Sequence, residues 1–314
     1  MAVVLVLGAN GRIGRAVAQA FLAGGWTVRG LVRPGTADRL PPGVEPVEAD
    51  GADAAALAAA GRGADVVVNA LNVPYERWRE TVPAFTAAVL AAQRASGALL
   101  MLPGNVYNFG ADMPPVLGPA TPQRATTVKG RIRVALEASL REAATRDGLR
   151  TAVIRAGDFY GGEGAGAWFD RIVAAKAARG IVVYPGPLDL VHAWAYVPDL
   201  AEAFRAVAER REAVSGFTDL PFAGDAPTGH ALIAAIGRAV GRPMRVRGLP
   251  WWALRLAGLV RPDLREVTEL AYLWRVPHAL DGTALEALAG PLPTTPFDTA
   301  VTRALAAIGV PVRG

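Results

Sequence analysis

Three glycines near the N-terminus have the spacing and the surroundings of a phosphate-binding turn. Gly8, Gly11 and Gly14 lie three residues apart, between an apolar run over 3–7 and a helical pattern over 15–22. The first glycine would allow a sharp turn, the second the approach of a diphosphate, and the third close packing of helix on sheet. Backbone N–H groups at the start of the helix would then attract the anion. The stretch predicts a dinucleotide site, although its GxxGxxG spacing also suits an ordinary strand-to-helix turn.

An arginine follows the second predicted strand, where the adenosine ribose of a dinucleotide would lie. This strand covers 26–32 and ends at Arg33, and no Asp or Glu occurs between residues 26 and 35. An acid here would accept a hydrogen bond from the 2′-hydroxyl of NAD, whereas an arginine accommodates the 2′-phosphate of NADP. Arg12 could add a second positive charge. We therefore predict NADP in preference to NAD; the alternative is that Arg33 is a solvated residue at a strand end.

Polar residues after the next two strands complete the predicted cofactor site. Asp50 follows the predicted strand 44–49, and its carboxylate could accept from the adenine amino group or cap the helix that starts near Asp53. The predicted strand 65–69 should end beside the glycine loop, because ligands of open α/β sheets lie at the carboxyl ends of the strands. The residues predicted to hold the cofactor are Gly8, Asn10, Gly11, Arg12, Ile13, Gly14, Arg33, Asp50, Asn69, Ala70, Leu71 and Asn72.

Strands and helices alternate through the first half of the chain. Predicted helices over 75–94 and 126–146 precede predicted strands over 98–102 and 150–155. This alternation predicts an α/β fold with a Rossmann-type, doubly wound parallel sheet. A smaller, mostly helical C-terminal substrate domain should follow. The expected division is a dinucleotide-binding domain over 1–160, completed by roughly 181–215, and a substrate-binding cap formed by 161–180 and 216–314.

The later elements are shorter and are interrupted by glycine and proline. We expect helices over 167–178, 200–210 and 228–240, and strands over 181–184, 191–194 and 217–223. Beyond Pro250 the chain should be helical with proline breaks. His192 and Trp194 are expected either in the wall of a substrate pocket or in the core. Trp251 and Trp252 are expected to pack beneath the cap.

Composition argues against several kinds of site and partner. The chain has no cysteine, and its three histidines are far apart, which argues against disulfides and a catalytic zinc. The net charge is +5, but no run of five or six like charges occurs, so nucleic acid is not indicated. The apolar segment 249–260 contains Arg255 and is too short to span a bilayer. With no signal peptide recognisable, we expect a cytoplasmic protein with a small-molecule substrate and no membrane partner.

Several motifs occur in an order that is similar to one family. They are Gly8–Gly14, Asp50, Asn69–Ala70, Asn105–Val106–Tyr107, Arg155–Gly161 and Tyr196–Ala201. The sequence resembles the extended short-chain dehydrogenase/reductase superfamily, and within it the NAD-dependent epimerase/dehydratase group. The resemblance implies an NAD(P)-binding Rossmann domain and a small C-terminal substrate domain. It also suggests a homodimer formed through the helices 75–94 and 128–146.

The residues that usually carry the chemistry of such enzymes are absent. The resemblance implies Ser or Thr together with Tyr-x-x-x-Lys, in which Tyr exchanges a proton and Lys lowers the pKa of that Tyr. No Tyr-x-x-x-Lys occurs in the chain. If Glu137 is matched to the family's glutamate, Lys129 takes the Tyr position and Arg133 the Lys position. In the other register Lys129 remains the lysine and Ala125 takes the Tyr position.

Two functions therefore stay open. The first is an NAD(P)-dependent oxidoreductase or epimerase-like enzyme acting on a small carbonyl or sugar-like substrate. Lys129, desolvated beside Arg133, would then be the proton donor, assisted by Tyr107 and by Asn105, which with Pro103 is a candidate for the family's serine position. The alternative is a catalytically inactive NAD(P)-binding regulatory or sensor protein. In that case Lys129 and Arg133 would only hold ribose or phosphate.

Overall fold

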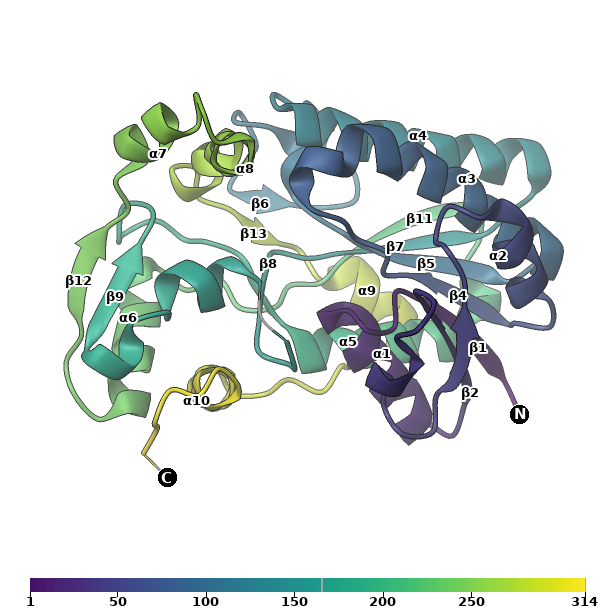
Figure 1. Cartoon of the computed structure of the whole chain (residues 1–314), viewed down its shortest axis with the longest axis horizontal. Helices are drawn as coiled ribbons and strands as arrows, with labels where there is room; N and C mark the ends of the chain where they lie inside the picture. Colours follow the sequence, from purple (N-terminus) through teal and green to yellow (C-terminus); the bar gives the residue numbers. More distant parts are fainter. Residues whose placement is uncertain (165, 314) are drawn as a thin grey trace.

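A seven-stranded parallel sheet forms the centre of the larger half of the molecule (Figure 1). The structure is a computed structural model that describes residues 1–164 and 166–313. Residues 165 and 314, which belong to the predicted cap segments, lie outside the described residues. In spatial order the strands are β11 (Phe217–Pro221), β7 (Thr151–Arg155), β5 (Leu99–Gly104), β4 (Val66–Asn69), β1 (Val3–Leu7), β2 (Thr27–Val32) and β3 (Glu45–Glu48).

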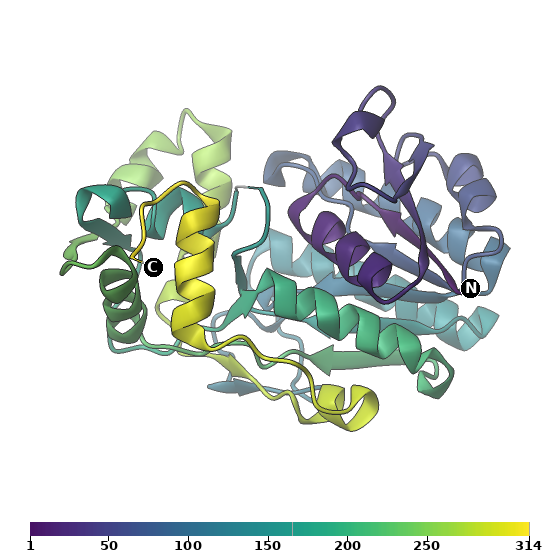
Figure 2. The ribbon, with the colours of Figure 1, turned by 90° about the horizontal axis from the view of Figure 1, so that it is seen from below.

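Helices cover both faces of this sheet (Figures 1 and 2). On one face, Val4 and Val6 of β1 are in the same core cluster as residues of α1 (Arg12–Ala23) and α5 (Val197–Glu209). On the other face, Leu5 and Leu7 are in a cluster with residues of α2 (Ala54–Gly61), α3 (Trp78–Ser96) and α4 (Val128–Asp147). Successive side chains of a strand point to opposite faces, so an uninterrupted apolar run is what a strand buried on both sides requires. The predicted Rossmann-type fold is confirmed.

The cap is built around a second core of its own. A two-stranded sheet of β9 (Ile181–Tyr184) and β12 (Arg245–Gly248) lies in it, beside α6 (Gly229–Val240) and α10 (Phe297–Ala307). Other helices of the cap are α7 (Trp251–Ala257), α8 (Pro262–Thr268) and the 3-10 helix η7 (Glu269–Trp274). The helix α9 (Thr283–Ala289) packs instead against the main sheet, with Leu285 in the same core cluster as α1 and α5. Two further pairs of short strands are β8 (Asp158–Tyr160) with β10 (Trp194–Tyr196), and β6 (Val116–Leu117) with β13 (Ala279–Leu280).

Some later elements differ from the prediction. The expected helix 167–178 is one π-helical turn, η4 (Phe169–Val173), and a 3-10 turn, η5 (Ala177–Arg179). The Asp170 carboxylate accepts from the N–H groups of Gly166 and Ala167 and pairs with Arg12, which fixes the start of this segment. The strand expected over 191–194 starts three residues later, because Val191 forms only an isolated bridge, to Thr228.

Two strands also pair with strands outside the domain to which the sequence had assigned them. β11, expected in the cap, pairs with β7 over five residues and is an edge strand of the main sheet. β9, expected to complete the first domain, pairs with β12 of the cap. A short apolar run shows that a segment is a strand but not which strand it joins. Among the described residues, no helix combines the length and the apolar character needed to cross a bilayer.

Candidate active site

The glycine loop has the backbone geometry of an anion site. Gly8 directly follows β1 and has φ of 80°, a conformation that favours glycine. The Gly11 N–H donates to Gly8 O over 2.9 Å, and Gly11 is the N-cap of α1. No side chain caps α1, and no acid lies in its first turn. The N–H groups at the start of α1 therefore suit an anionic group, as helix N-termini with free donors do.

The glycines also allow a close approach of the loop, α1 and the end of β4. A Cβ on Gly14 would lie 2.2 Å from Gly8 O, and a Cβ on Gly8 would lie 2.8 Å from Ala70 O. The Asn69 side chain accepts from Leu71 N–H over 3.2 Å, which holds the turn after β4. The predicted residues Asn69, Ala70 and Leu71 therefore adjoin the loop, and Asn72 next to them is exposed.

Side chains of the loop are used mainly to fix neighbouring segments. The Asn10 amide donates to Thr36 O over 2.8 Å and so holds the turn after β2. Arg12 forms an ion pair with Asp170 and donates to Gly164 O. Its positive charge is therefore already paired on the cap side. The Ile13 side chain is partly buried and packs against the core cluster on the α1 face of the sheet.

Arg33 is exposed at the carboxyl end of β2 and forms no ion pair within the described residues. An acid that sequence reasoning missed lies beside it, because the Glu48 carboxylate at the end of β3 accepts from Gly35 N–H over 3.2 Å. Register in the sheet brings it there, since Glu48 pairs with Val32. The nearby Asp50 is exposed and accepts from Ala52 N–H over 2.9 Å.

The helix after Asp50 is capped by another acid. Asp53 is the N-cap of α2 and accepts from the N–H groups of Ala55 and Ala56, each over 3.0 Å. The capping alternative considered for Asp50 is therefore wrong, because Asp53 fills that position. A contact of Asp50 with adenine stays a prediction.

Lys129 lies in the first turn of α4 and is almost fully buried. Its ammonium forms ion pairs with Glu266 of α8 and Glu269 of η7, both partly exposed. The ammonium also lies 5.1 Å from the centre of the Tyr75 ring. Glu269 accepts from Val128 N–H as well, so η7 is held against the N-terminus of α4. The cap thus supplies both partners of the predicted proton donor.

The other predicted catalytic residues are also hydrogen-bonded. Arg133 donates to Pro103 O over 2.6 Å, and burial lowers the pKa of its guanidinium. The Asn105 side chain accepts from Tyr107 N–H over 3.0 Å, closing the turn after β5. The Tyr107 hydroxyl is 3.0 Å from that of Tyr75, and burial raises the pKa of both phenols, that of Tyr75 to about 12.

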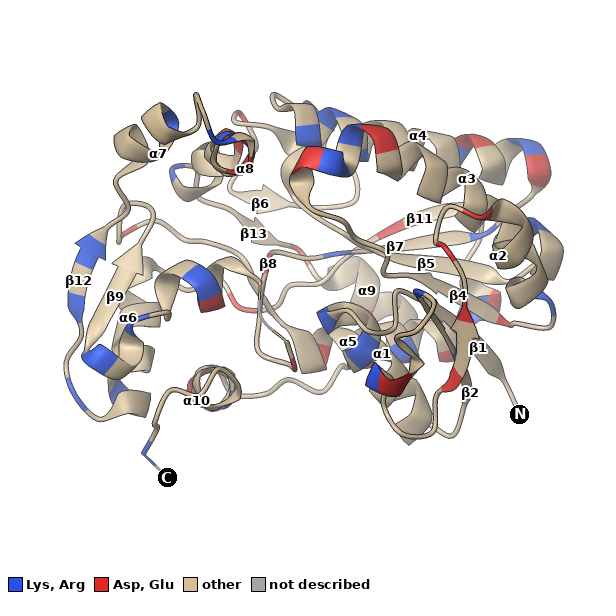
Figure 3. Cartoon of the chain, in the orientation of Figure 1, with Lys and Arg blue, Asp and Glu red and all other residues tan. Residues whose placement is uncertain are grey.

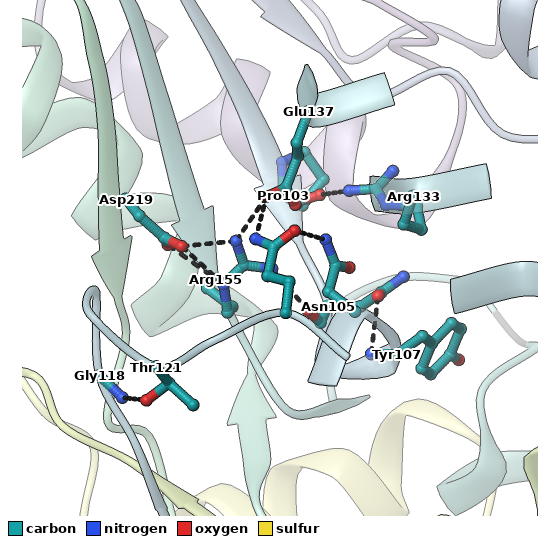
Figure 4. A network of polar contacts seen from close by, with 11 residues as sticks. Pro103, Asn105, Tyr107, Gly118, Thr121, Arg133, Glu137, Arg155 and Asp219 are labelled. Atoms are coloured by element: carbon teal, nitrogen blue, oxygen red, sulfur yellow. Dashed lines mark hydrogen bonds and ion pairs between the residues drawn. The ribbon is translucent and has the colours of Figure 1, made fainter. Parts of the chain in front are cut away.

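A buried polar network fixes the carboxyl ends of β5, β7 and β11 beneath these residues (Figure 4). Arg155 of β7 is completely buried and pairs with Glu137 of α4 over 2.9 Å and with Asp219 of β11 over 2.6 Å. It also donates to Asn105 O over 2.7 Å, while Gln123 donates to Glu137 over 2.7 Å. The turn that carries Asn105 and Tyr107 is therefore positioned from below by a guanidinium.

Comparison with known proteins agrees with this geometry. Residues 4–218 match the model of a family described as the NAD dependent epimerase/dehydratase family. The chain belongs to this family. Among curated proteins, no sequence matches closely enough to count as a relative.

Solved structures of proteins named UDP-glucose 4-epimerase have the same fold as this chain, although their sequence identity to it is low. UDP-glucose 4-epimerase from Brucella ovis, solved in complex with NAD, has a TM-score of 0.78 at 18% identity, with 100% of both chains covered. The enzyme from Bifidobacterium longum, in complex with NAD+ and UDP, has a TM-score of 0.74 at 17% identity, covering 96% of this chain and 97% of the other.

This epimerase/dehydratase family member also carries an acidic and aromatic cluster around His192, whose acid, Asp158, sequence reasoning did not single out as a site residue. Asp158 of β8 is 2.8 Å from Nε2 of His192, whose ring is stacked on Trp274 at 4.2 Å. His278 lies against His192 at 4.6 Å, and burial lowers the pKa of His278 to about 3, so this ring is neutral. The position of Asp158 could have been noticed in the sequence, because Asp158 is a carboxylate three residues after the buried strand β7.

The negative charge of Asp158 also affects the pKa values of several tyrosines. Burial is the main cause that raises the pKa values of four tyrosines, and the charge of Asp158 adds a smaller effect, so these tyrosines keep their protons at neutral pH. They are Tyr75, Tyr107, Tyr184 and Tyr272. Trp194 is buried beside this cluster, which agrees with the core alternative considered for it. Of the four tyrosines, Tyr107 and its partner Tyr75 place neutral hydroxyl groups at the turn after β5.

Proposed function

We propose that this chain is an NAD(P)-dependent oxidoreductase or epimerase that acts on a small carbonyl or sugar-like substrate. The observation that carries the proposal is the uncapped N-terminus of α1 behind a loop in which Gly8 and Gly14 leave no room for a side chain. Such a site would hold the diphosphate of a dinucleotide. The nicotinamide of that cofactor would accept or supply hydride.

NADP is the proposed form of the cofactor, because Arg33 is exposed and unpaired within the described residues. Arg12 supports this choice less, since its charge is paired with Asp170. Glu48 is the feature that favours NAD, because a carboxylate near the ribose would accept from a 2′-hydroxyl. The solved relatives named above were crystallised with NAD.

Replacing Arg33 by aspartate should weaken NADPH binding about ten- to a hundredfold, the usual worth of a hydrogen bond to a charged group. The dissociation constant for NADH should change much less, because NADH has no 2′-phosphate. Fluorescence titration with both cofactors measures the effect, and Arg210→Asp, a change at another exposed arginine, is the control. Equal losses for NADPH and NADH would rule out Arg33 as a phosphate ligand.

Lys129 is the proposed proton donor. An ammonium has three N–H donors, and two of them are directed at Glu266 and Glu269. The third remains for a substrate oxygen, with the hydroxyl of Tyr107 as an assisting donor. Because Glu266 and Glu269 are partly exposed, they can return protons from solvent to the lysine.

Lys129→Met should lower turnover at least about a hundredfold, as expected for loss of a general acid, while NADPH still binds. Turnover is measured by NADPH oxidation over a broad panel of carbonyl compounds. Arg131→Met, an exposed position on the same helix, is the control and should keep turnover. Unchanged turnover in Lys129→Met would show that another group donates the proton.

The second candidate function is a sensor that binds the cofactor without reaction. The ion pairs of Lys129 with two carboxylates and the hydrogen bond of Arg133 to Pro103 O favour it, because both cations already have partners within the protein. Wild-type protein that binds NADPH but oxidises it with no member of the carbonyl panel would support this function. Turnover with any member would exclude it.

A further inference from the structure

Four large apolar side chains are exposed together at one end of the cap. Trp252 and Leu256 of α7 are 70% and 60% exposed, and Leu259 and Val260 in the following turn are 82% and 80% exposed. Trp251, by contrast, is buried and donates to Pro185 O over 2.6 Å. The expectation that both tryptophans pack beneath the cap is therefore wrong for Trp252, because α7 buries only its opposite face.

The chain around these side chains is positively charged. No Asp or Glu occurs between Asp225 and Asp263, a stretch that contains Arg238, Arg242, Arg245, Arg247, Arg255 and Arg261. Figure 3 shows blue and no red on β12 and α7, which lie along the same edge of the molecule.

Four of these arginines have no acidic partner within the described residues, and one of the four, Arg242, donates to Ala178 O instead. Arg245, Arg247 and Arg255 are exposed and form no ion pair within residues 1–164 and 166–313. Arg245 and Arg247 alternate along β12 and so point the same way. Arg255 lies on α7 itself, next to Leu256. An exposed apolar centre is thus accompanied by uncompensated positive charge.

We propose that α7, the turn 258–260 and β12 form a docking surface for an anionic lipid bilayer. Trp252, Leu256, Leu259 and Val260 enter the boundary between headgroups and acyl chains, as the apolar face of an interfacial helix does. The arginines bind lipid phosphates, and Trp252 is of the residue type enriched at membrane interfaces. In this arrangement the segment 249–260, which is too short to span a bilayer, lies on the bilayer surface.

The positive charge of this surface favours an anionic bilayer, rather than a second copy of the chain, as the partner that covers it. In a twofold pair the same surface would meet itself, so Arg245, Arg247 and Arg255 would face like charges. An anionic bilayer offers negative charge around the apolar contact, and both parts of the surface are then satisfied. The inference does not depend on catalysis, since none of these side chains belongs to the proposed active site.

Flotation of the full chain with vesicles tests the proposal. We expect binding to vesicles of phosphatidylcholine mixed with phosphatidylglycerol, much weaker binding to phosphatidylcholine alone, and a loss of binding as salt is raised. Arg245→Gln with Arg247→Gln should lower the partition coefficient about thirtyfold, at the usual contribution of an arginine near an anionic surface. Trp252→Ser with Leu259→Ser should lower it at least about tenfold.

Two control variants change similar side chains elsewhere. Arg62→Gln with Arg210→Gln removes two exposed arginines, and Val116→Ser removes an exposed apolar side chain, so both should float as the wild type does. Among the described residues Trp252 is the only exposed tryptophan, so a blue shift of fluorescence on vesicles should vanish in Trp252→Phe.

Other results would overturn the proposal. Absence of flotation with anionic vesicles would do so, as would equal flotation of wild type and both surface variants. A vesicle-free dimer that Trp252→Ser with Leu259→Ser converts to a monomer would show instead that a second copy covers the surface.

Discussion

Replacing Gly14 by alanine is expected to destabilise the protein by about 3 kcal/mol, the upper part of the range for overpacking a tight site. The added Cβ would lie 2.2 Å from Gly8 O and 2.8 Å from Gly8 C, both backbone atoms that cannot rotate away. The loop and α1 would have to separate. A thermal melt should show the midpoint lowered by roughly 5 to 10 °C. NADPH binding should be lost with it.

Gly11→Ala is the matched change that separates binding from folding. Gly11 has φ of −77°, which alanine adopts readily, and its Cβ would meet only Gly8 O, at 3.3 Å. The melting temperature should therefore stay near that of the wild type. NADPH affinity should fall at least about tenfold, because the methyl group occupies space that a diphosphate needs. Unchanged affinity in Gly11→Ala would contradict a dinucleotide site at this loop.

Replacing Arg155 by methionine is expected to cost about 3 to 5 kcal/mol, since removal of one member of a buried ion pair leaves its partners unpaired. Glu137 and Asp219 would then be two buried carboxylates without their guanidinium. Chemical denaturation at neutral pH measures the loss. Arg146→Met, which removes exposed ion pairs with Glu142 and Asp147, should leave the unfolding midpoint nearly unchanged.

The pH dependence of the stability of Arg155→Met should show whether the unpaired carboxylates cause the loss of stability. In the wild type, burial raises the pKa of Glu137, but the charge and hydrogen bond of Arg155, together with Arg133 and Gln123, more than offset this, so the net shift is downward. Stability from Glu137 is thus present above its unfolded pKa and is lost as pH falls through the folded pKa. Without Arg155, burial raises the pKa values of both Glu137 and Asp219, as it already does for Asp219.

In the variant the folded state therefore binds protons more tightly than the unfolded state. Its free energy of unfolding should rise as pH falls from 7 towards 5. Adding Asp219→Asn should recover part of the loss at pH 7, because an amide is neutral. A variant whose stability falls in acid as steeply as that of the wild type would show that the two carboxylates are not the cause.

The family and the sheet could be predicted from the sequence because their signals are local. The run Val3–Leu7 and the three glycines after it require only neighbours in the chain, and they predicted β1, the turn and α1 correctly. The strand at Val66–Asn69 was within one residue of its expected start. Periodicity and turn chemistry are properties of short segments, so these elements needed no tertiary information.

The environment of the candidate site was decided by contacts between distant segments. Lys129 meets Glu266 and Glu269 across 137 and 140 residues, and Arg12 meets Asp170 across 158. Arg155 pairs with Asp219 because β11 joins β7. A sequence shows which residues carry charge, but partners are chosen by how helices and strands pack.

The sequence by itself determined that this chain folds as a Rossmann-type sheet with a glycine loop suited to a dinucleotide. Only the tertiary structure decided which cations remain free, since Arg12 and Lys129 are paired with the cap while Arg33 is not. It also decided that Trp251 is buried and Trp252 exposed, although they are adjacent. The reason is physical: local patterns fix backbone conformation, whereas burial and ion pairing depend on which surfaces meet.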